Sequence, residues 1–163
     1  MLYIRNFEQN DFDSVKDIYQ QGIDTGNATF ETQAKEWDEW NNSMLHVGRL
    51  VAVENDRVVG WAALSPVSNR YVYDGVAEVS VYVASEACGK GVGQALLSKL
   101  VEESEKEGVW TLQAGIFPEN ESSIALHRKN GFRIVGVREK LAKMGEKWRD
   151  VVLLERRSKV AGV

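Results

Sequence analysis

The sequence predicts a mixed α/β (α+β) fold in which helices cover both faces of a mixed, mostly antiparallel sheet of about six to seven strands. Three observations support this prediction. Residues 78–83 alternate apolar and polar side chains as a strand does, and a glycine-rich turn then leads into helical spacing over residues 92–101. Residues 50–53 and 58–64 form two strand patterns joined by an Asn-Asp turn, which indicates a hairpin. Strand and helix patterns together follow the order β-α-α-β-β-β-α-β-α-β-β.

The first elements follow from short-range patterns. A strand is predicted over residues 2–5, and a helix then carries an apolar stripe from Phe12 to Ile23, with Asp11 as its potential N-cap. A second helix is predicted over residues 36–44, without a clear cap. Its two tryptophans are three residues apart and share one face, which favours packing against the rest of the domain over contact with a ligand.

The second half of the chain contains further alternating and helical patterns. The elements predicted after the central helix are a strand, a short helix and two strands, over residues 110–117, 119–129, 132–137 and 147–155. Gly131 is placed to end the short helix and Gly145 to turn between the last two strands. The chain from Arg156 onward is expected to fray.

Composition and charge exclude several classes of protein. A chain of 163 residues fits one domain, and a net charge of −4 argues against a nucleic-acid partner. Cys88 is the single cysteine, and with only His46 and His127 beside it no metal-ligand spacing exists, so no metal is expected. Residues 1–8 lack the features of a signal peptide, and no apolar run approaches the ~18 residues of a membrane span. We therefore expect a soluble, cytoplasmic protein without a membrane partner.

The glycine-rich turn at residues 89–93 is the clearest candidate for a binding site. Glycines remove the Cβ atoms that would keep an anion away, and the start of the central helix offers free N–H groups and the positive end of its dipole. Lys90 adds positive charge. The predicted ligand is a nucleotide-like pyrophosphate, although neither the P-loop spacing nor the dinucleotide spacing is present. The alternative is that the glycines only form a tight strand-to-helix turn.

Two motifs resemble those of the GNAT superfamily of N-acetyltransferases. The turn is similar to its coenzyme A signature [RQ]-x-x-G-x-[GA], with Cys88 at the Arg/Gln position. Residues 120–132 read N-x-x-S-x-x-L-H-x-x-N-G-F and resemble its second motif, and the order of elements agrees with that family. His127 stands where the family usually has a tyrosine.

Other segments resemble one subgroup of this superfamily, the phosphinothricin and methionine sulfoximine acetyltransferases. That subgroup also has a histidine at the position of His127. The segments at residues 27–32, 65–78 and 148–151 are similar to its sequences, except that Arg149 replaces a histidine common there. The resemblance covers nearly the whole chain and implies a GNAT fold, one acetyltransferase domain over residues 1–163, and a homodimer.

The resemblance implies an acetyl-CoA-dependent transfer of an acetyl group to the α-amino group of a small amino acid or analogue. Phosphinothricin, methionine sulfoximine and methionine sulfone are typical acceptors, and their acetylation is a detoxification. Glu78 is at the position of the proposed general base, with an edge carboxylate or an ordinary ion pair as the alternative. The N–H near Val81 is a potential donor to the thioester oxygen. His127 or Tyr82 could protonate the thiolate, or His127 could instead bond within its own helix.

The remaining candidate residues come from the same resemblance. Those expected to bind acetyl-CoA are Val81, Tyr82, Val83, Gly89, Lys90, Gly91, Val92, Gly93, Gln94, Asn120 and Ser123. Those expected to contact the acceptor are Phe30, Arg70, Tyr73, Glu78, Val79 and Ser80.

Arg70 is the predicted partner of the acceptor carboxylate, because its planar guanidinium offers two parallel donors. The alternative is that Arg70 is a solvated loop charge. Two other functions stay open at the level of sequence. One is an acetyltransferase for a polyamine, an aminoglycoside or a protein N-terminus, which would favour an acidic pocket. The other is a non-catalytic acetyl-CoA sensor, which a thiol-release assay distinguishes from an enzyme.

Overall fold

One seven-stranded sheet forms the centre of the computed structural model, which describes residues 1–163. Its strands are β1 (Leu2–Asn6), β2 (Leu50–Glu54), β3 (Arg57–Pro66), β4 (Val76–Val83), β5 (Thr111–Ile116), β6 (Arg133–Met144) and β7 (Lys147–Arg157). The helices are α1 (Phe12–Asp24), α2 (Trp37–Ser43), α3 (Val92–Lys106) and α4 (Glu121–Lys129). The predicted order of these elements is confirmed.

The strands lie side by side in the order β1-β2-β3-β4-β5-β7-β6. Every neighbouring pair is antiparallel except β4 and β5. These two are parallel because α3 carries the chain back between them, as a parallel connection requires. The prediction of a mixed, mostly antiparallel sheet is therefore confirmed.

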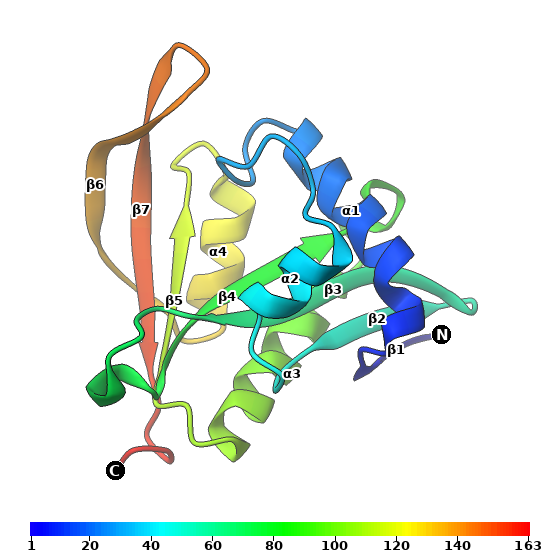
Figure 1. Cartoon of the computed structure of the whole chain (residues 1–163), viewed down its shortest axis with the longest axis horizontal. Helices are drawn as coiled ribbons and strands as arrows, with labels where there is room; N and C mark the ends of the chain where they lie inside the picture. The colour runs from blue at the N-terminus through cyan, green and yellow to red at the C-terminus, as the bar shows by residue number, and fades with distance from the viewer.

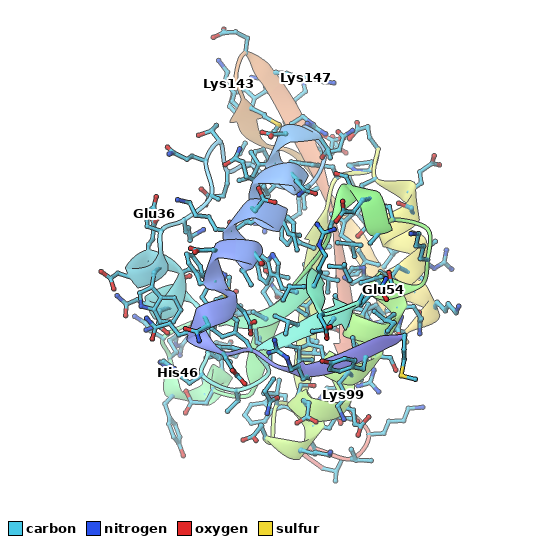
Figure 2. The ribbon with its side chains drawn as sticks, turned by 90° about the vertical axis from the view of Figure 1, so that its right-hand side faces the viewer. Glu36, His46, Glu54, Lys99, Lys143 and Lys147 are labelled. Atoms are coloured by element: carbon cyan, nitrogen blue, oxygen red, sulfur yellow. The ribbon has the colours of Figure 1, made fainter.

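Helices cover both faces of the sheet, as predicted. α1 and α2 lie on one face, and α3 and α4 lie on the other (Figure 1). Figure 2 shows the same layers from the side, with the β6–β7 hairpin extending beyond them and Lys143 and Lys147 near its tip. The core on the α3 face includes Leu96 and Leu100, both fully buried, and the core on the α1 face includes Val15. Burial of these apolar stripes holds the layers together.

Two local predictions are confirmed by backbone angles and packing. Asn55 and Asp56 have φ of 53° and 62°, as the two central residues of a hairpin turn between β2 and β3 require. Trp37 and Trp40 stack with their ring centroids 6.2 Å apart. Trp40 is buried and lies edge-on to Trp61 at 5.8 Å, so the tryptophan face of α2 packs on the sheet.

Asp11 is the N-cap residue of α1, as predicted, but its carboxylate is used elsewhere. Its side chain makes no cap hydrogen bond to that helix. The carboxylate instead accepts two hydrogen bonds from Arg5 of β1, at 2.8 and 2.9 Å, and one from the N–H of Glu8 at 2.8 Å. The Arg5 guanidinium lowers the pKa of Asp11, since it stabilises the charged form. A partner six residues earlier in the sequence therefore competes successfully with the helix terminus.

The last two strands are longer than the sequence pattern predicts. β6 continues well beyond Val137, where the predicted strand ends. Its register against β7 shifts between Arg138 and Ala142, and Lys140 there has a positive φ of 46°. The N–H of Lys140 donates to Asp150 Oδ1 at 2.8 Å. A bulge of this kind interrupts the alternation of side chains. The sequence pattern therefore does not predict the part of the strand beyond Val137.

The prediction that the chain frays from Arg156 is also wrong. β7 continues to Arg157. Ser158 Oγ then donates to Glu105 Oε2 at 2.6 Å, and the N–H of Ser158 donates to the carbonyl of Trp110 at 2.8 Å. These contacts tie the end of β7 to α3 and to the start of β5, so the backbone polar groups of this segment find partners within the fold.

Candidate active site

A cleft of about 420 Å³ opens between β4 and β5. The two strands pair only where Val76–Glu78 faces Thr111–Gln113. Beyond this point β4 stays paired with β3 as far as Val83, and β5 stays paired with β7 as far as Ile116. Each strand therefore follows its antiparallel neighbour, and the parallel ladder between them ends. The resulting gap leaves the backbone and side chains of both strands open to a ligand.

The structure brings together part of the predicted site. The predicted residues in the wall of the cleft are Phe30, Glu78, Val79, Ser80, Val81, Tyr82, Asn120, Ser123 and His127. Outside this wall, at the end of β4 and the start of α3, lie Val83, Gly89, Lys90, Gly91, Val92, Gly93 and Gln94. Arg70 and Tyr73 also lie outside it, in the loop before β4.

Glu78 occupies the point at which β4 and β5 separate. It is half-buried, and its Oε1 accepts a hydrogen bond from Gln113 Nε2 at 2.9 Å. Gln113 faces Glu78 across the last rung of the ladder. This bond is the one contact of the Glu78 carboxylate with a donor side chain, so the ion pair considered from sequence is not formed. One carboxylate oxygen is thus oriented by Gln113, and the other is available to a ligand in the cleft.

A backbone N–H of β4 also points toward the cleft. The N–H of Ala84 donates to the carbonyl of Val59, in β3, at 2.8 Å. Because alternate residues of a strand direct their N–H groups to opposite neighbours, Tyr82 also donates toward β3. Val81 then directs its N–H toward the side from which β5 has diverged. This geometry suits a donor to a ligand oxygen.

The glycine-rich turn forms an open cradle in front of α3. Gly89 and Gly91 both have positive φ, 78° and 82°. A Cβ built on either residue meets nothing within 4 Å, so the space above the turn is open. Gly91 is the N-cap of α3, whose first N–H groups face this space. Backbone donors, an open surface and the helix dipole together favour an anionic group.

The side chains of two neighbouring residues are occupied within the protein. Val92 is buried in the core. Gln94 exchanges two hydrogen bonds with the amide of Asn130, at 2.9 and 3.2 Å. The cradle is therefore made by backbone groups, and these side chains hold α3 in place.

Asn120 joins two parts of the cleft wall. Its Oδ1 accepts from the N–H of Ser123 at 3.3 Å as the N-cap of α4. Its Nδ2 donates to the carbonyl of Asn27 at 3.3 Å. Both ends of this amide are thus used within the chain, and its predicted bond to the pantetheine arm of acetyl-CoA stays a prediction.

Residues 12–132 match the family model described as "Acetyltransferase (GNAT) family". The chain belongs to the GNAT acetyltransferase family. It is 33% identical over 164 residues to the phosphinothricin N-acetyltransferase of Streptomyces coelicolor, covering 95% of each chain. It is 30% identical over 119 residues to the L-methionine sulfoximine/L-methionine sulfone acetyltransferase of Pseudomonas aeruginosa, covering 71% of this chain and 69% of that protein.

A solved structure of a relative agrees with this assignment. The GNAT superfamily phosphinothricin acetyltransferase of Sinorhizobium meliloti, in complex with acetyl-CoA, superimposes with a TM-score of 0.89 at 30% identity, covering 99% of this chain and 90% of that chain. The predicted family, fold and co-substrate are thereby confirmed, and the protein is an acetyl-CoA-dependent N-acetyltransferase. The open cradle and the gap between β4 and β5 fit the two parts of acetyl-CoA, its pyrophosphate and its pantetheine arm.

In this GNAT acetyltransferase, His127 is buried on α4 and faces the cleft. Its Nδ1 lies 2.7 Å from the carbonyl of Ser123, which only an N–H can bond, so Nδ1 carries the proton. Burial lowers the pKa of the imidazole, and the bond to Ser123 opposes this only in part. The ring is therefore neutral at pH 7 with an unprotonated Nε2. In this state His127 accepts a hydrogen bond, and it can donate a proton to a thiolate only after first gaining one.

Tyr82 is the other acid that the GNAT pattern suggests. Its ring stacks on Trp61 at 5.0 Å and contacts Tyr19 of α1 at 5.0 Å, so the side chain lies on the α1 face of the sheet. Burial raises the pKa of its hydroxyl, which stays protonated. Tyr82 and His127 thus approach the cleft from opposite faces.

Arg70 and Tyr73 lie together outside the cleft wall. Arg70 is exposed and precedes the 3₁₀ helix η2 (Tyr71–Tyr73). Its guanidinium lies 5.6 Å from the centre of the Tyr73 ring. Arg70 therefore does not line the cleft of a single chain, and its contact with an acceptor carboxylate stays a prediction.

Sequence reasoning missed three polar residues of the acetyltransferase site. Gln113 orients Glu78. Lys35 lies in the cleft wall, and its Nζ is 3.2 Å from Tyr19 Oη and 3.2 Å from Glu31 Oε1. No motif marks these two residues, because each acquires its role through contact with distant parts of the chain.

Arg149 is the third missed residue, although the sequence shows it in place of a histidine. It is buried, and it donates to the carbonyl of Gly26 at 2.9 Å, to Asn27 Oδ1 at 2.8 Å and to Glu119 Oε1 at 3.1 Å. Its guanidinium also lies 3.9 Å from the centre of the Phe117 ring. Arg149 thus joins β7, the loop after α1 and the segment before α4, behind the wall of the cleft.

The structure has no group of three or more His, Cys, Asp or Glu side chains arranged to hold a metal ion. None of its helices is both long and apolar enough to span a membrane.

Proposed function

We propose that this enzyme acetylates the α-amino group of a small amino acid or amino-acid analogue, of the phosphinothricin, methionine sulfoximine or methionine sulfone type. Transfer is direct, from acetyl-CoA to the amine, with Glu78 as general base. The observation that carries the proposal is the position of Glu78 in the cleft at the point where β4 and β5 separate, held by Gln113 and without an ion-pair partner.

The first task of the site is to remove a proton from the acceptor amine, which is mostly protonated near pH 7. A carboxylate with one oriented and one available oxygen suits this step, directly or through a water molecule. Gln113 orients Glu78 through a neutral amide and brings no charge of its own. Ser80 and Val79, also in the cleft wall, then contact the acceptor next to Glu78.

The second task is to stabilise charge on the acyl group and the leaving thiol. The N–H of Val81 is directed toward the gap and donates to the thioester oxygen. His127, whose Nε2 is unprotonated, can accept the proton that the acceptor nitrogen loses as the C–N bond forms and pass it to the thiolate as the C–S bond breaks. Tyr82 supplies a protonated hydroxyl from the α1 face.

Acetyl-CoA binding is assigned to the two open surfaces. The cradle at residues 89–93 receives the pyrophosphate, with Lys90 adding charge. The edge of β4 over residues 81–83 and the start of α4 at Asn120 and Ser123 receive the pantetheine arm. Holding both substrates in one cleft can itself lower the barrier by ~7–11 kcal/mol.

A panel of acceptors tests this proposal. Enzyme and acetyl-CoA are mixed with L-phosphinothricin, L-methionine sulfoximine, L-methionine sulfone, ordinary L-amino acids, spermidine, an aminoglycoside and an alanine-initiated peptide. Released coenzyme A is followed with a thiol-reactive dye. We expect the highest kcat/KM for one of the amino-acid acceptors, with the α-amine acetylated. A higher kcat/KM for the polyamine, aminoglycoside or peptide would show that the acceptor class is wrong.

We further propose that residues 1–163 form one acetyltransferase domain that works as a homodimer in the cytoplasm. The single sheet and the single core cluster support one domain, and acetyl-CoA is an intracellular metabolite. β6 is a terminal strand of the sheet, and four of its apolar side chains are between 40% and 54% exposed: Ile134, Val135, Val137 and Leu141. An unpaired apolar edge of this kind is suited to contact with a second copy.

Mutation of this edge tests the homodimer. Val137→Lys places a charge in the apolar strip, and we expect it to convert a dimer into a monomer in size-exclusion chromatography with light scattering. Tyr3→Lys is the matched control, because Tyr3 is 48% exposed on β1, the opposite terminal strand. A monomeric wild-type protein, or a dimer that survives Val137→Lys, would count against this interface.

A further inference from the structure

An amino-acid acceptor brings a carboxylate into the cleft together with its amine. A partly buried carboxylate needs a cationic partner, since desolvation of an unpaired charge is costly. The cleft wall contains two cationic side chains, Lys35 and Arg138. Arg138 is exposed on β6, whereas the Lys35 side chain is only 19% exposed. Arg70 is not in the wall.

Lys35 lies on the same face of the sheet as Glu78. Its Nζ is 3.2 Å from Tyr19 Oη and 5.6 Å from the centre of the Tyr19 ring. Tyr19 in turn contacts the ring of Tyr82 at 5.0 Å. Tyr82 and Glu78 are an even number of residues apart on β4, so their side chains point to the same face. Lys35 and Glu78 therefore enter one cleft from the same side.

The Lys35 ammonium can bind a ligand while it stays protonated and keeps its hydrogen bond to Tyr19. It has three donors, and two are used by Tyr19 and by Glu31 Oε1 at 3.2 Å. The Glu31 side chain is 48% exposed, so a ligand carboxylate can replace it while Glu31 returns to water. Burial alone would lower the pKa of Lys35, but the hydrogen bonds from its ammonium to Tyr19 and Glu31 outweigh burial and raise it. The group is thus protonated when a carboxylate arrives.

We propose that Lys35 binds the carboxylate of the acceptor and thereby makes the enzyme select α-amino acids over amines that lack this group. The proposal rests on the proposed function and names the residue that sets its acceptor class. It also replaces Arg70, the residue that the sequence favours for this role, with one inside the cleft wall.

Two acceptors that differ only in the carboxylate test the proposal. L-Methionine sulfone and its carboxamide are compared at saturating acetyl-CoA with the wild type and with Lys35→Met. We expect kcat/KM for the acid to fall about ten- to hundredfold, as for loss of a charged hydrogen bond, and mainly through KM. The value for the carboxamide should stay near that of the wild type. The ratio of the two values is measured on one preparation, so partial loss of folded protein cancels.

Matched variants decide between the candidate cations. Lys35→Arg should recover part of the preference for the acid, and Lys35→Glu should reverse the preference toward the carboxamide. Arg138→Met and Arg70→Met remove the competing cations and should leave the ratio near the wild-type value. An equal fall for both acceptors in Lys35→Met, or a change of ratio in Arg138→Met or Arg70→Met alone, would overturn the role of Lys35.

Measurements on the wild type distinguish a failure of the proposed role of Lys35 from a failure of the proposed acceptor class. Acetylation of the acid by the wild type supports the proposed acceptor class whatever Lys35→Met does. A wild type that uses the carboxamide as well as the acid overturns only the role of Lys35. A wild type that acetylates no α-amino acid overturns both proposals.

Discussion

Replacing Glu78 with glutamine should lower kcat by ~10²–10⁴-fold, the usual contribution of a positioned general base. Glutamine keeps the size of the side chain and can still meet Gln113, so the cleft should stay intact. The KM for acetyl-CoA should hardly change, because the lost basic group acts on the acceptor. Steady-state kinetics with a saturating acceptor measure both quantities.

The pH–rate profile gives a second test of Glu78. If the carboxylate accepts the proton, the acid limb of kcat/KM reports its deprotonation and should be altered in Glu78→Gln. Glu107→Gln is the control, since Glu107 is exposed at the end of α3 and away from the cleft. A small fall in kcat with an unaltered acid limb would mean that water alone removes the proton. Glu78 would then not be the general base.

Replacing Gly91 with valine should raise the KM for acetyl-CoA by at least about tenfold, the change expected when one charge-assisted contact is lost. A Cβ at this position points into open space above the turn, where the pyrophosphate is assigned. The positive φ of 82° also strains a β-branched residue, by about 1–3 kcal/mol. Isothermal titration with coenzyme A, together with kinetics, separates lost binding from lost stability.

Gly108→Val is the matched control for this strain. Gly108 has a φ of 80°, and a Cβ there also meets nothing within 4 Å, but it lies beyond the other end of α3. Both variants should lose a similar amount of thermal stability, and only Gly91→Val should lose affinity for coenzyme A. Equal affinities of the two variants for coenzyme A would show that the glycine-rich turn does not bind the cofactor.

The sequence by itself determined features that depend on neighbouring residues. The Asn55-Asp56 turn, the helix that begins after Gly91 and the tryptophan face of α2 all appear where the patterns predict them. Each depends on a local backbone preference or on the period of a strand or helix, so a few consecutive residues suffice. The glycine turn and the motif at residues 120–132 also indicated the acetyltransferase family, which the match to the GNAT family model confirms.

Only the tertiary structure decided which polar groups meet in the cleft. Gln113 reaches Glu78 across 35 residues of sequence, and Arg149 reaches Asn27 across 122. Lys35 lies in the cleft wall and Arg70 does not, although the sequence analysis named only Arg70 for the acceptor carboxylate. These outcomes depend on where β4 and β5 part and on how loops close over the sheet. Both are set by contacts between distant segments, which leave no periodic trace in the sequence.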